Sequence, residues 1–286
     1  MIVQRTISTV LLAVVFIVAP ALAYSVAGSI VLLVVMNVTL GLGLFEFYDI
    51  VEKKGSTSLM LYGIIAGLVY NTFSFLTAAN GPIGVLPPGA FTLSFYLLIV
   101  VFFVMQLARR DGSSAIYNFS GTIAGIIYVA WFFGFVAQIT YFDATGHGWW
   151  LYFAMTILVT KGTDVGAYIV GVLVGRTPLA PRISPKKTVE GAAAGLVVGI
   201  AAGVACAAWL PLPRELALWR GAVVGAVLSI VGQFGDVAES VLKRDAGVKD
   251  SGARLPGLGG ILDVIDSMLF ATPLMYFFMV FGVMWD

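Results

Sequence analysis

Long apolar runs decide what this chain can fold into. A bilayer crossing needs about 20 predominantly apolar residues, and we find nine such stretches, at roughly 7–23, 28–47, 59–79, 90–108, 115–137, 149–174, 190–210, 219–241 and 263–284. Only 11% of the 286 residues are charged, whereas a soluble domain carries about 25%. The sequence therefore predicts an all-α, polytopic membrane helix bundle with about nine transmembrane helices.

Lysine and arginine set the predicted orientation, because cytoplasmic loops are enriched in both. With a cytoplasmic N-terminus, thirteen of the 16 Lys and Arg residues fall on the cytoplasmic side. Arg214 and Arg220 fall on the opposite side, and Lys161 lies inside a span. The run that follows Arg5 and ends in PALAY also resembles a signal peptide with a cleavage site near Ala23. Its removal would leave eight spans and move no later loop to the other side.

Composition excludes several classes of function. A net charge of +1 gives no basic field for nucleic acid. Cys206 is the only cysteine and His147 the only histidine, so an intrachain disulfide, a CxxC motif and a histidine-based metal site are not expected. We interpret Cys206 as a small apolar core residue.

Two opposite charges stand inside the sixth predicted span, in the stretch TKGTDVGAY. Lys161 and Asp164 are three residues apart, so they share a helix face and can pair. Each charge at the centre of a span costs about 2.5–3.5 kcal/mol on insertion scales. Two interpretations stay open, namely a structural ion pair between helices and a position lining a polar cavity.

The eighth predicted span ends in a polar stripe. Asp236, Glu239, Ser240 and Lys243 are spaced i, i+3, i+4 and i+7, so they occupy one helix face. The residues that precede them are apolar on every side. Such a stripe at the end of a buried helix is expected to face protein or water rather than lipid.

Two further aspartates begin the ninth predicted span. Asp263 and Asp266 share one helix face, and acids at a helix start can be ordinary capping residues. Together with Asp236 they also form the all-oxygen ligand set that hard divalent cations prefer. We therefore predict Mg²⁺ or Mn²⁺ at Asp236, Asp263 and Asp266.

Two predicted cytoplasmic loops, 175–190 and 241–262, supply positive charge and a glycine-rich turn. The PGLGG run precedes Asp263, and the backbone N–H groups of its glycines can approach an anion closely. Cations, carboxylates and such a turn are the parts of a phosphate-transfer site. The candidate catalytic residues are Asp236, Lys243, Arg244, Asp263 and Asp266. The candidate substrate-binding residues are Lys161, Asp164, Ser184, Lys186, Lys187, Thr188, Glu190, Ser240, Lys249, Asp250, Gly259 and Gly260.

The motifs resemble those of a known family. TKGTDVGAY at 160–168, SPKKTVEG at 184–191, GDVAESVLKRDAGVKDSG at 235–252 and LPGLGGILDVIDS at 255–267 are similar, in order and spacing, to the phosphatidate cytidylyltransferase (CDP-diacylglycerol synthase) pattern. The family usually has His where this chain has Leu258, and Arg where it has Val264. Any role of that His or Arg does not carry over.

The resemblance implies a nucleotidyltransferase of phospholipid biosynthesis that converts CTP and phosphatidic acid to CDP-diacylglycerol and pyrophosphate. It implies a multi-pass protein of the inner (plasma) membrane with its site at the cytoplasmic face. A monovalent cation besides Mg²⁺, and a homodimer, are further expectations. Within this picture residues 1–110 are variable transmembrane helices and residues 111–286 form the catalytic region. The alternatives are a CTP-using transferase for an ether lipid or a polyprenol, a membrane transporter, and a pseudoenzyme or scaffold.

Overall fold

A computed structural model describes residues 17–55, 59–78, 81–87, 89–108, 115–142, 148–212, 216–249, 251–252 and 260–281. The chain forms two compact units. The first comprises residues 1–142 and 245–263, and the second comprises residues 143–244 and 264–286. The boundary predicted at residue 110 lies outside the described residues.

The first unit is built from the helices of the N-terminal half. They are α2 (Val26–Lys53), α3 (Met60–Leu76), α4 (Gly89–Ala108), α5 (Ala115–Gly125) and α6 (Phe132–Thr140), with the π-helical turn η1 (Ile126–Trp131) between the last two. Ser25 caps α2, because its side chain accepts a hydrogen bond from the N–H of Gly28 at 3.0 Å. Buried side chains also link the helices, as when Tyr48 donates to the carbonyl of Thr122 at 2.8 Å.

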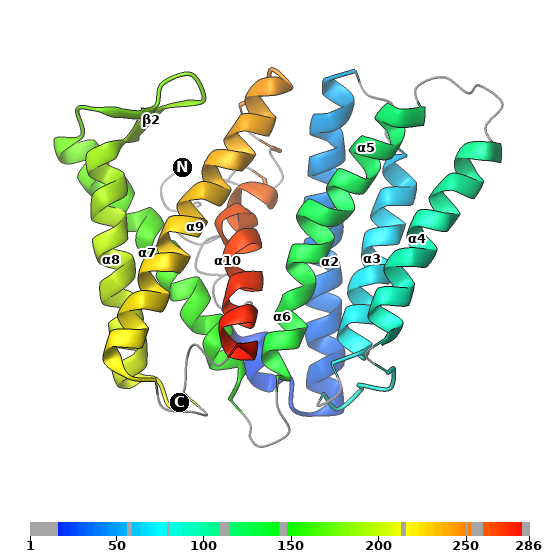
Figure 1. Cartoon of the computed structure of the whole chain (residues 1–286), viewed down its shortest axis with the longest axis horizontal. Coiled ribbons are helices and arrows are strands. Elements are labelled where there is room, and N and C mark those ends of the chain that lie inside the picture. Colours follow the sequence, from blue (N-terminus) through cyan, green and yellow to red (C-terminus); the bar gives the residue numbers. More distant parts are fainter. Residues whose placement is uncertain are drawn as a thin grey trace. The chain divides into compact units, whose positions relative to one another are not determined.

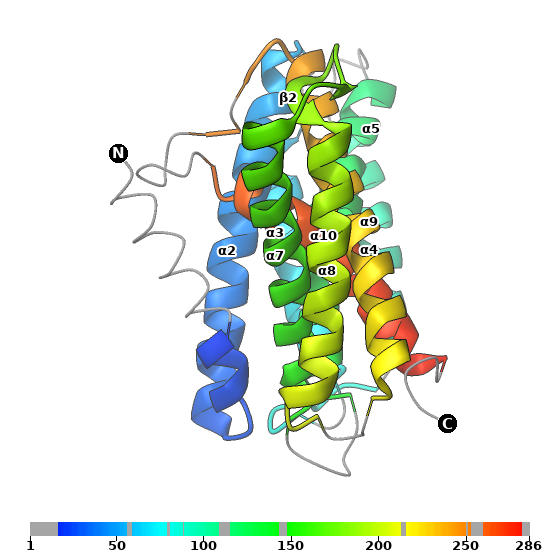
Figure 2. The same cartoon turned by 90° about the vertical axis from the view of Figure 1, so that its left-hand side faces the viewer.

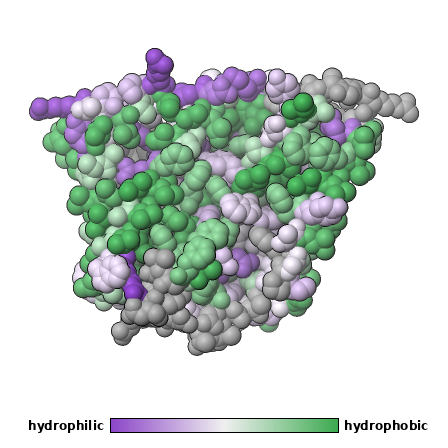
Figure 3. Space-filling view, viewed as in Figure 1, coloured by the Kyte–Doolittle hydropathy of each residue, from purple (hydrophilic) through white to green (hydrophobic). Residues whose placement is uncertain are grey.

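The second unit contains α7 (Trp150–Val174), α8 (Val189–Trp209), α9 (Leu218–Asp245) and most of α10 (Leu262–Val280). A short antiparallel hairpin, β1 (Pro178–Ala180) and β2 (Ser184–Thr188), joins α7 to α8. The helices α7 and α8 lie side by side, and the hairpin stands at the end where they are connected (Figures 1 and 2). Hydrophobic side chains cover the middle of the visible face over α8 and α9, while hydrophilic ones gather at the hairpin end (Figure 3).

The chain is an all-α, multi-pass membrane protein. By length and composition, six helical stretches of the described part can cross a membrane: Val26–Lys53, Ala115–Thr140, Trp150–Val174, Val189–Trp209, Leu218–Asp245 and Leu262–Val280. Met60–Leu76 and Thr92–Ala108 are apolar but shorter. These eight stretches coincide within a few residues with predicted spans, whereas most of the predicted span 7–23 lies outside the described residues.

The loop predicted at 175–190 is ordered differently from the expectation. It contains the hairpin, in which Pro178 pairs with Thr188 and Ala180 with Ser184. Prolines at 178, 181 and 185 cannot donate hydrogen bonds to a strand ladder. A two-stranded pairing that consists only of edges tolerates them, and the described part of the chain is all-α apart from this hairpin.

Candidate functional site

Three carboxylates converge inside the second unit. Single oxygens of Asp236, Glu239 and Asp266 all lie within 4.8 Å of one another. Glu239 is 0% exposed and Asp266 is 4% exposed. Asp236 lies about 14 Å before the end of α9, at 1.5 Å per helical residue. The sequence predicted Asp236 and Asp266 as metal ligands, and the structure brings them together with Glu239 as the third member.

Asp236, Glu239 and Asp266 are called the carboxylate cluster below. Lysine side chains compensate its negative charge. Lys187 on β2 pairs with Asp236 at 2.6 Å. Lys243 pairs with Glu239 at 2.7 Å, one turn further along α9. Both lysines were predicted to bind the substrate or act on it, and both reach the cluster from the hairpin end of the unit.

The charges predicted inside the sixth span belong to the same unit. Lys161 Nζ lies 3.2 Å from Asp164 and donates to Ser267 Oγ at 3.0 Å. Ser267 follows Asp266 on α10, and its Oγ also lies 3.4 Å from Asp164. Because Lys161 and Asp164 are each about one third exposed, this pair borders accessible space. The ion pair is therefore formed within α7 rather than between helices, and Ser267 is what links it to α10; a role in lining a polar cavity stays a prediction.

Close helix packing sets where α9 presents its acids. Along α8, Gly191, Gly195, Gly199 and Gly203 recur every four residues and are buried. A Cβ at Gly225 of α9 would lie only 2.5 Å from the carbonyl oxygen of Gly199. Small residues of this kind let two backbones approach in lipid. The α8–α9 crossing is therefore fixed by backbone contact.

Two residues that were predicted to bind the substrate stabilise the hairpin. Thr188 caps α8 by accepting from the N–H of Gly191 at 3.1 Å. Glu190 accepts from the N–H groups of Arg176 and Thr177, each at 3.2 Å. These contacts are structural, and substrate contacts of Thr188 and Glu190 stay a prediction.

The other predicted residues of the second unit lie on the same elements. Arg244 Nε donates to the carbonyl of Ile183 at 3.0 Å, which ties the end of α9 to the hairpin. Ser184 is half-buried, Lys186 is exposed, and Ser240 is 9% exposed. The hairpin end of this unit thus carries the cationic side chains of Lys186, Lys187 and Arg244, besides that of Arg182 in the turn between β1 and β2.

Asp263 belongs to the first unit and makes the contacts of a capping acid, one of the two interpretations that the sequence left open. Its Oδ2 accepts from the N–H of Gly260 at 2.8 Å and from the N–H of Ser251 at 3.4 Å. These bonds join the start of α10 to the preceding loop, as expected for an acid at a helix N-terminus. Metal binding by Asp263 stays a prediction. Lys249 is exposed, while Asp250 and Gly259 lie outside the described residues.

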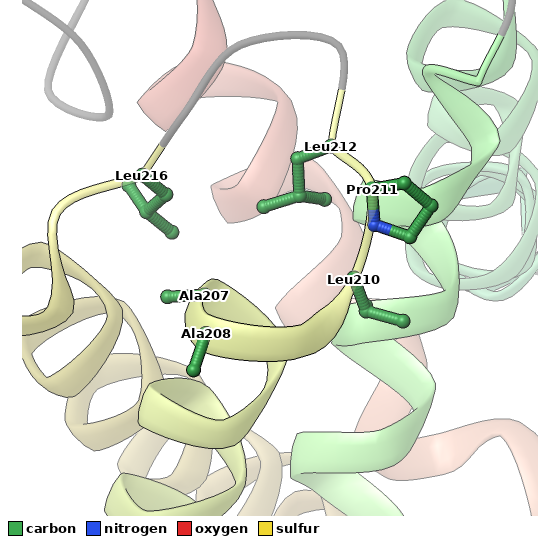
Figure 4. A pocket seen from close by; sticks show the side chains of 6 residues that line it. All are labelled: Ala207, Ala208, Leu210, Pro211, Leu212 and Leu216. Carbon is green, nitrogen blue, oxygen red and sulfur yellow. The ribbon is translucent and has the colours of Figure 1, made fainter.

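A separate cavity lies at the opposite end of α8 and α9. Ala207, Ala208, Leu210, Pro211, Leu212 and Leu216 line it (Figure 4). These six described residues are all apolar, so their side chains offer no charge to a phosphate or a cation. The polar chemistry of the second unit is concentrated at the carboxylate cluster and the hairpin.

Comparison with known proteins gives the family. The model of the cytidylyltransferase family matches residues 3–281. The chain belongs to the cytidylyltransferase family. A protein of Chlamydia pneumoniae named phosphatidate cytidylyltransferase is 31% identical over 252 residues, which cover 83% of this chain and 78% of that protein.

Shorter stretches are more similar to other members of the family. The phosphatidate cytidylyltransferase of a Synechocystis strain is 50% identical over 119 residues, 41% of this chain and 39% of that protein. The Bacillus subtilis protein of the same name is 42% identical over 153 residues, 53% of this chain and 54% of that protein. In these two comparisons the chain spans about half the length of its relatives or less.

The carboxylate cluster of this cytidylyltransferase family member fits a hard divalent cation. Its donors are all carboxylate oxygens, and they are close enough for one ion to contact all three. Neither sulfur nor imidazole is present among them, which disfavours zinc. In the sequence, Glu239 was assigned only to the polar stripe of the eighth predicted span. Its spacing of three from Asp236 was the signal that could have added it to the ligand set.

Proposed function

We propose that this chain transfers the cytidylyl group of CTP to phosphatidic acid, giving CDP-diacylglycerol and pyrophosphate. In this reaction a phosphate oxygen of the lipid forms a bond to the α-phosphorus of CTP. The bond from that phosphorus to the bridging oxygen of the β-phosphate breaks, and pyrophosphate leaves. Family membership is the observation that carries the proposal, and a partly buried carboxylate cluster beside a cationic hairpin supports it.

The proposed reaction requires neutralisation of the phosphate charges rather than a strong general base. A lipid phosphate oxygen is already anionic near neutral pH, so the lack of a histidine in the cluster is no obstacle. Lys186, Lys187, Lys243 and Arg244 neutralise the phosphates, with arginine suited to two-point contacts and lysine acting as a point charge. Lys161 holds the carboxylate of Asp164 and the hydroxyl of Ser267 in place.

Asp236, Glu239 and Asp266 would hold Mg²⁺ or Mn²⁺, with Asp263 kept as a predicted further ligand. A bound divalent cation of this kind stabilises the negative charge that develops on a leaving pyrophosphate. A monovalent cation and a homodimer remain parts of the proposal that rest on the family resemblance alone.

We further propose nine spans, a cytoplasmic N-terminus and a location in the inner membrane, with the hairpin on the cytoplasmic side where CTP is available. The count of lysines and arginines supports this orientation. Cys206 is buried, so a cysteine introduced at exposed Lys186 can be labelled against a low background. Labelling of Lys186→Cys by an impermeant maleimide in inverted vesicles but not in intact cells is expected, and the reverse pattern would refute the orientation.

The activity test uses purified protein in detergent, radiolabelled CTP and phosphatidic acid, with and without Mg²⁺. We expect a chloroform-soluble labelled product that depends on Mg²⁺. Because Leu258 and Val264 depart from the family pattern, an ether lipid and a polyprenyl phosphate are tested in parallel. A labelled product from one of these acceptors alone would reassign the substrate, and no product from any acceptor would refute the transferase proposal.

A further inference from the structure

Glu46 is a buried acid that the proposed reaction has not used. It lies on α2, in the stretch GLGLFEFYDI within a predicted span, and is 1% exposed. A charge in such a place is costly unless hydrogen bonds compensate for it. The contacts of this carboxylate inside the first unit show how that cost is reduced.

The carboxylate of Glu46 joins two segments that are far from it in the sequence. Its Oε2 accepts from the N–H of Leu262, the first residue of α10, at 2.9 Å. The same oxygen accepts from the hydroxyl of Ser251 at 3.3 Å. Ser251 and Leu262 flank the glycine-rich stretch of the signature sequence, so one oxygen holds both of its ends.

Two glycines make this contact possible. A Cβ at Gly252 would lie 2.7 Å from Glu46 Oε1, and a Cβ at Gly260 would collide with Glu46 Oε2 and with Ser251 Oγ. The backbone on both sides thus lies directly against the carboxylate. Any side chain at these two positions would displace either Glu46 or the loop ends.

The second oxygen shows that stability alone does not explain Glu46. Oε1 is buried and has no hydrogen-bond partner among the described residues. A buried acceptor without a donor is unfavourable, and an apolar residue would avoid that cost. A carboxylate does, however, suit the positive end of the α10 dipole, where Asp263 also accepts from Gly260 and Ser251.

We propose that Glu46 is a positioning residue for the reaction. Together with Asp263 it holds the start of α10, and the loop ends at Ser251 and Gly260, in the geometry required for turnover. This inference rests on the proposed function for its kinetic part. Glu46 would touch neither nucleotide nor lipid, so its loss should lower kcat and leave the KM for CTP nearly unchanged.

The kinetic experiment compares Glu46→Gln with Asp49→Asn in the purified full-length protein. Both variants delete one negative charge from α2, but Asp49 is on the surface, where it pairs with Lys53 at 2.5 Å, and such pairs contribute little. Glutamine keeps an acceptor oxygen but loses the charge, and charge-assisted hydrogen bonds are about twice as strong as neutral ones. We therefore expect Glu46→Gln to lower kcat by about fivefold to tenfold. The KM for CTP should change less than about threefold in both, and kcat should be unchanged in Asp49→Asn.

A second measurement does not depend on activity. Hydrogen exchange of the Leu262 amide should be at least about tenfold faster in Glu46→Ala, because its acceptor is removed. If the wild-type protein forms no product, the proposed function fails, and exchange alone decides the contact. Wild-type kcat in Glu46→Gln, or unchanged exchange in Glu46→Ala, would overturn the inference. Should the Glu46 variants fail to fold, Ser251→Ala replaces them, with lowered kcat supporting the inference and wild-type kcat refuting it.

Discussion

The crossing of α8 and α9 yields a sharp prediction about stability. In the variant Gly225→Ala, the new Cβ would lie 2.5 Å from the carbonyl oxygen of Gly199 and 3.1 Å from the Cα of Gly203. Both atoms are backbone, so no side chain can rotate away. The two helices must separate or bend, and overpacking of this kind costs about 1–3 kcal/mol.

Gly162→Ala on α7 is the matched control. There the Cβ would meet the Cγ1 of Val198 at 3.7 Å and the Cβ of Ala202 at 4.0 Å, which are ordinary contacts. Both substitutions gain helix propensity, worth up to about 1 kcal/mol, and this gain cancels in the comparison. The difference between the two variants should therefore be about 1–3 kcal/mol, with Gly162→Ala at or above the wild-type stability.

Thermal unfolding in one detergent, followed by tryptophan fluorescence, measures the difference directly. We expect the Tm of Gly225→Ala to be lower than that of the wild type and lower than that of Gly162→Ala. Equal Tm values for the two variants would refute the argument. They would mean that the α8–α9 distance is not limited by backbone contact at Gly225.

Three further predictions concern the site. Asp266→Asn and Glu239→Gln should each reduce Mg²⁺-dependent product formation by at least about a hundredfold. This loss is larger than is usual for residues that only support a metal ligand. Near-normal turnover with Mg²⁺ would contradict the assignment of these residues as ligands. Lys187→Ala should raise the KM for CTP by about tenfold or more, as for loss of one charged hydrogen bond, whereas Lys53→Ala, which breaks an exposed pair, should not change it. The same Lys187→Ala protein should bind Mn²⁺ more tightly when CTP is absent, because the lysine no longer competes with the cation for Asp236. Electron paramagnetic resonance measures the Mn²⁺ affinity, and an unchanged affinity would argue against that competition.

Hydropathy predicted the helices well because the bilayer fixes their length. The predicted span 190–210 is α8 at Val189–Trp209, and the predicted span 149–174 is α7 at Trp150–Val174. In the same way, the spacing of Lys161 and Asp164 on one helix face predicted their ion pair, observed at 3.2 Å. Local periodicity determines such features, so one sequence is enough to find them.

Features that depend on distant contacts were not predictable in this way. Glu46 and Leu262 are 216 residues apart, and no local pattern links them. A signal for Glu46 was nevertheless present, since it lies inside a predicted span, as Lys161 does, and the cost of an intramembrane charge applies to both. The structural roles of Thr188 and Glu190 were likewise hidden, because they depend on a strand pairing that no local pattern of this loop predicted.

The pairing of lysines with carboxylates connects the structure to the proposed chemistry. Asp236 and Glu239 each have a lysine partner within 2.7 Å, and those lysines are the groups that the proposal assigns to the phosphates. A lysine cannot fully neutralise a carboxylate and a phosphate at once, so nucleotide binding must weaken the pairs. The carboxylates then lose their compensation unless a cation replaces it, because unscreened acids this close repel one another. Nucleotide and divalent cation should consequently each raise the affinity of the site for the other, as linkage requires of any two ligands coupled in this way.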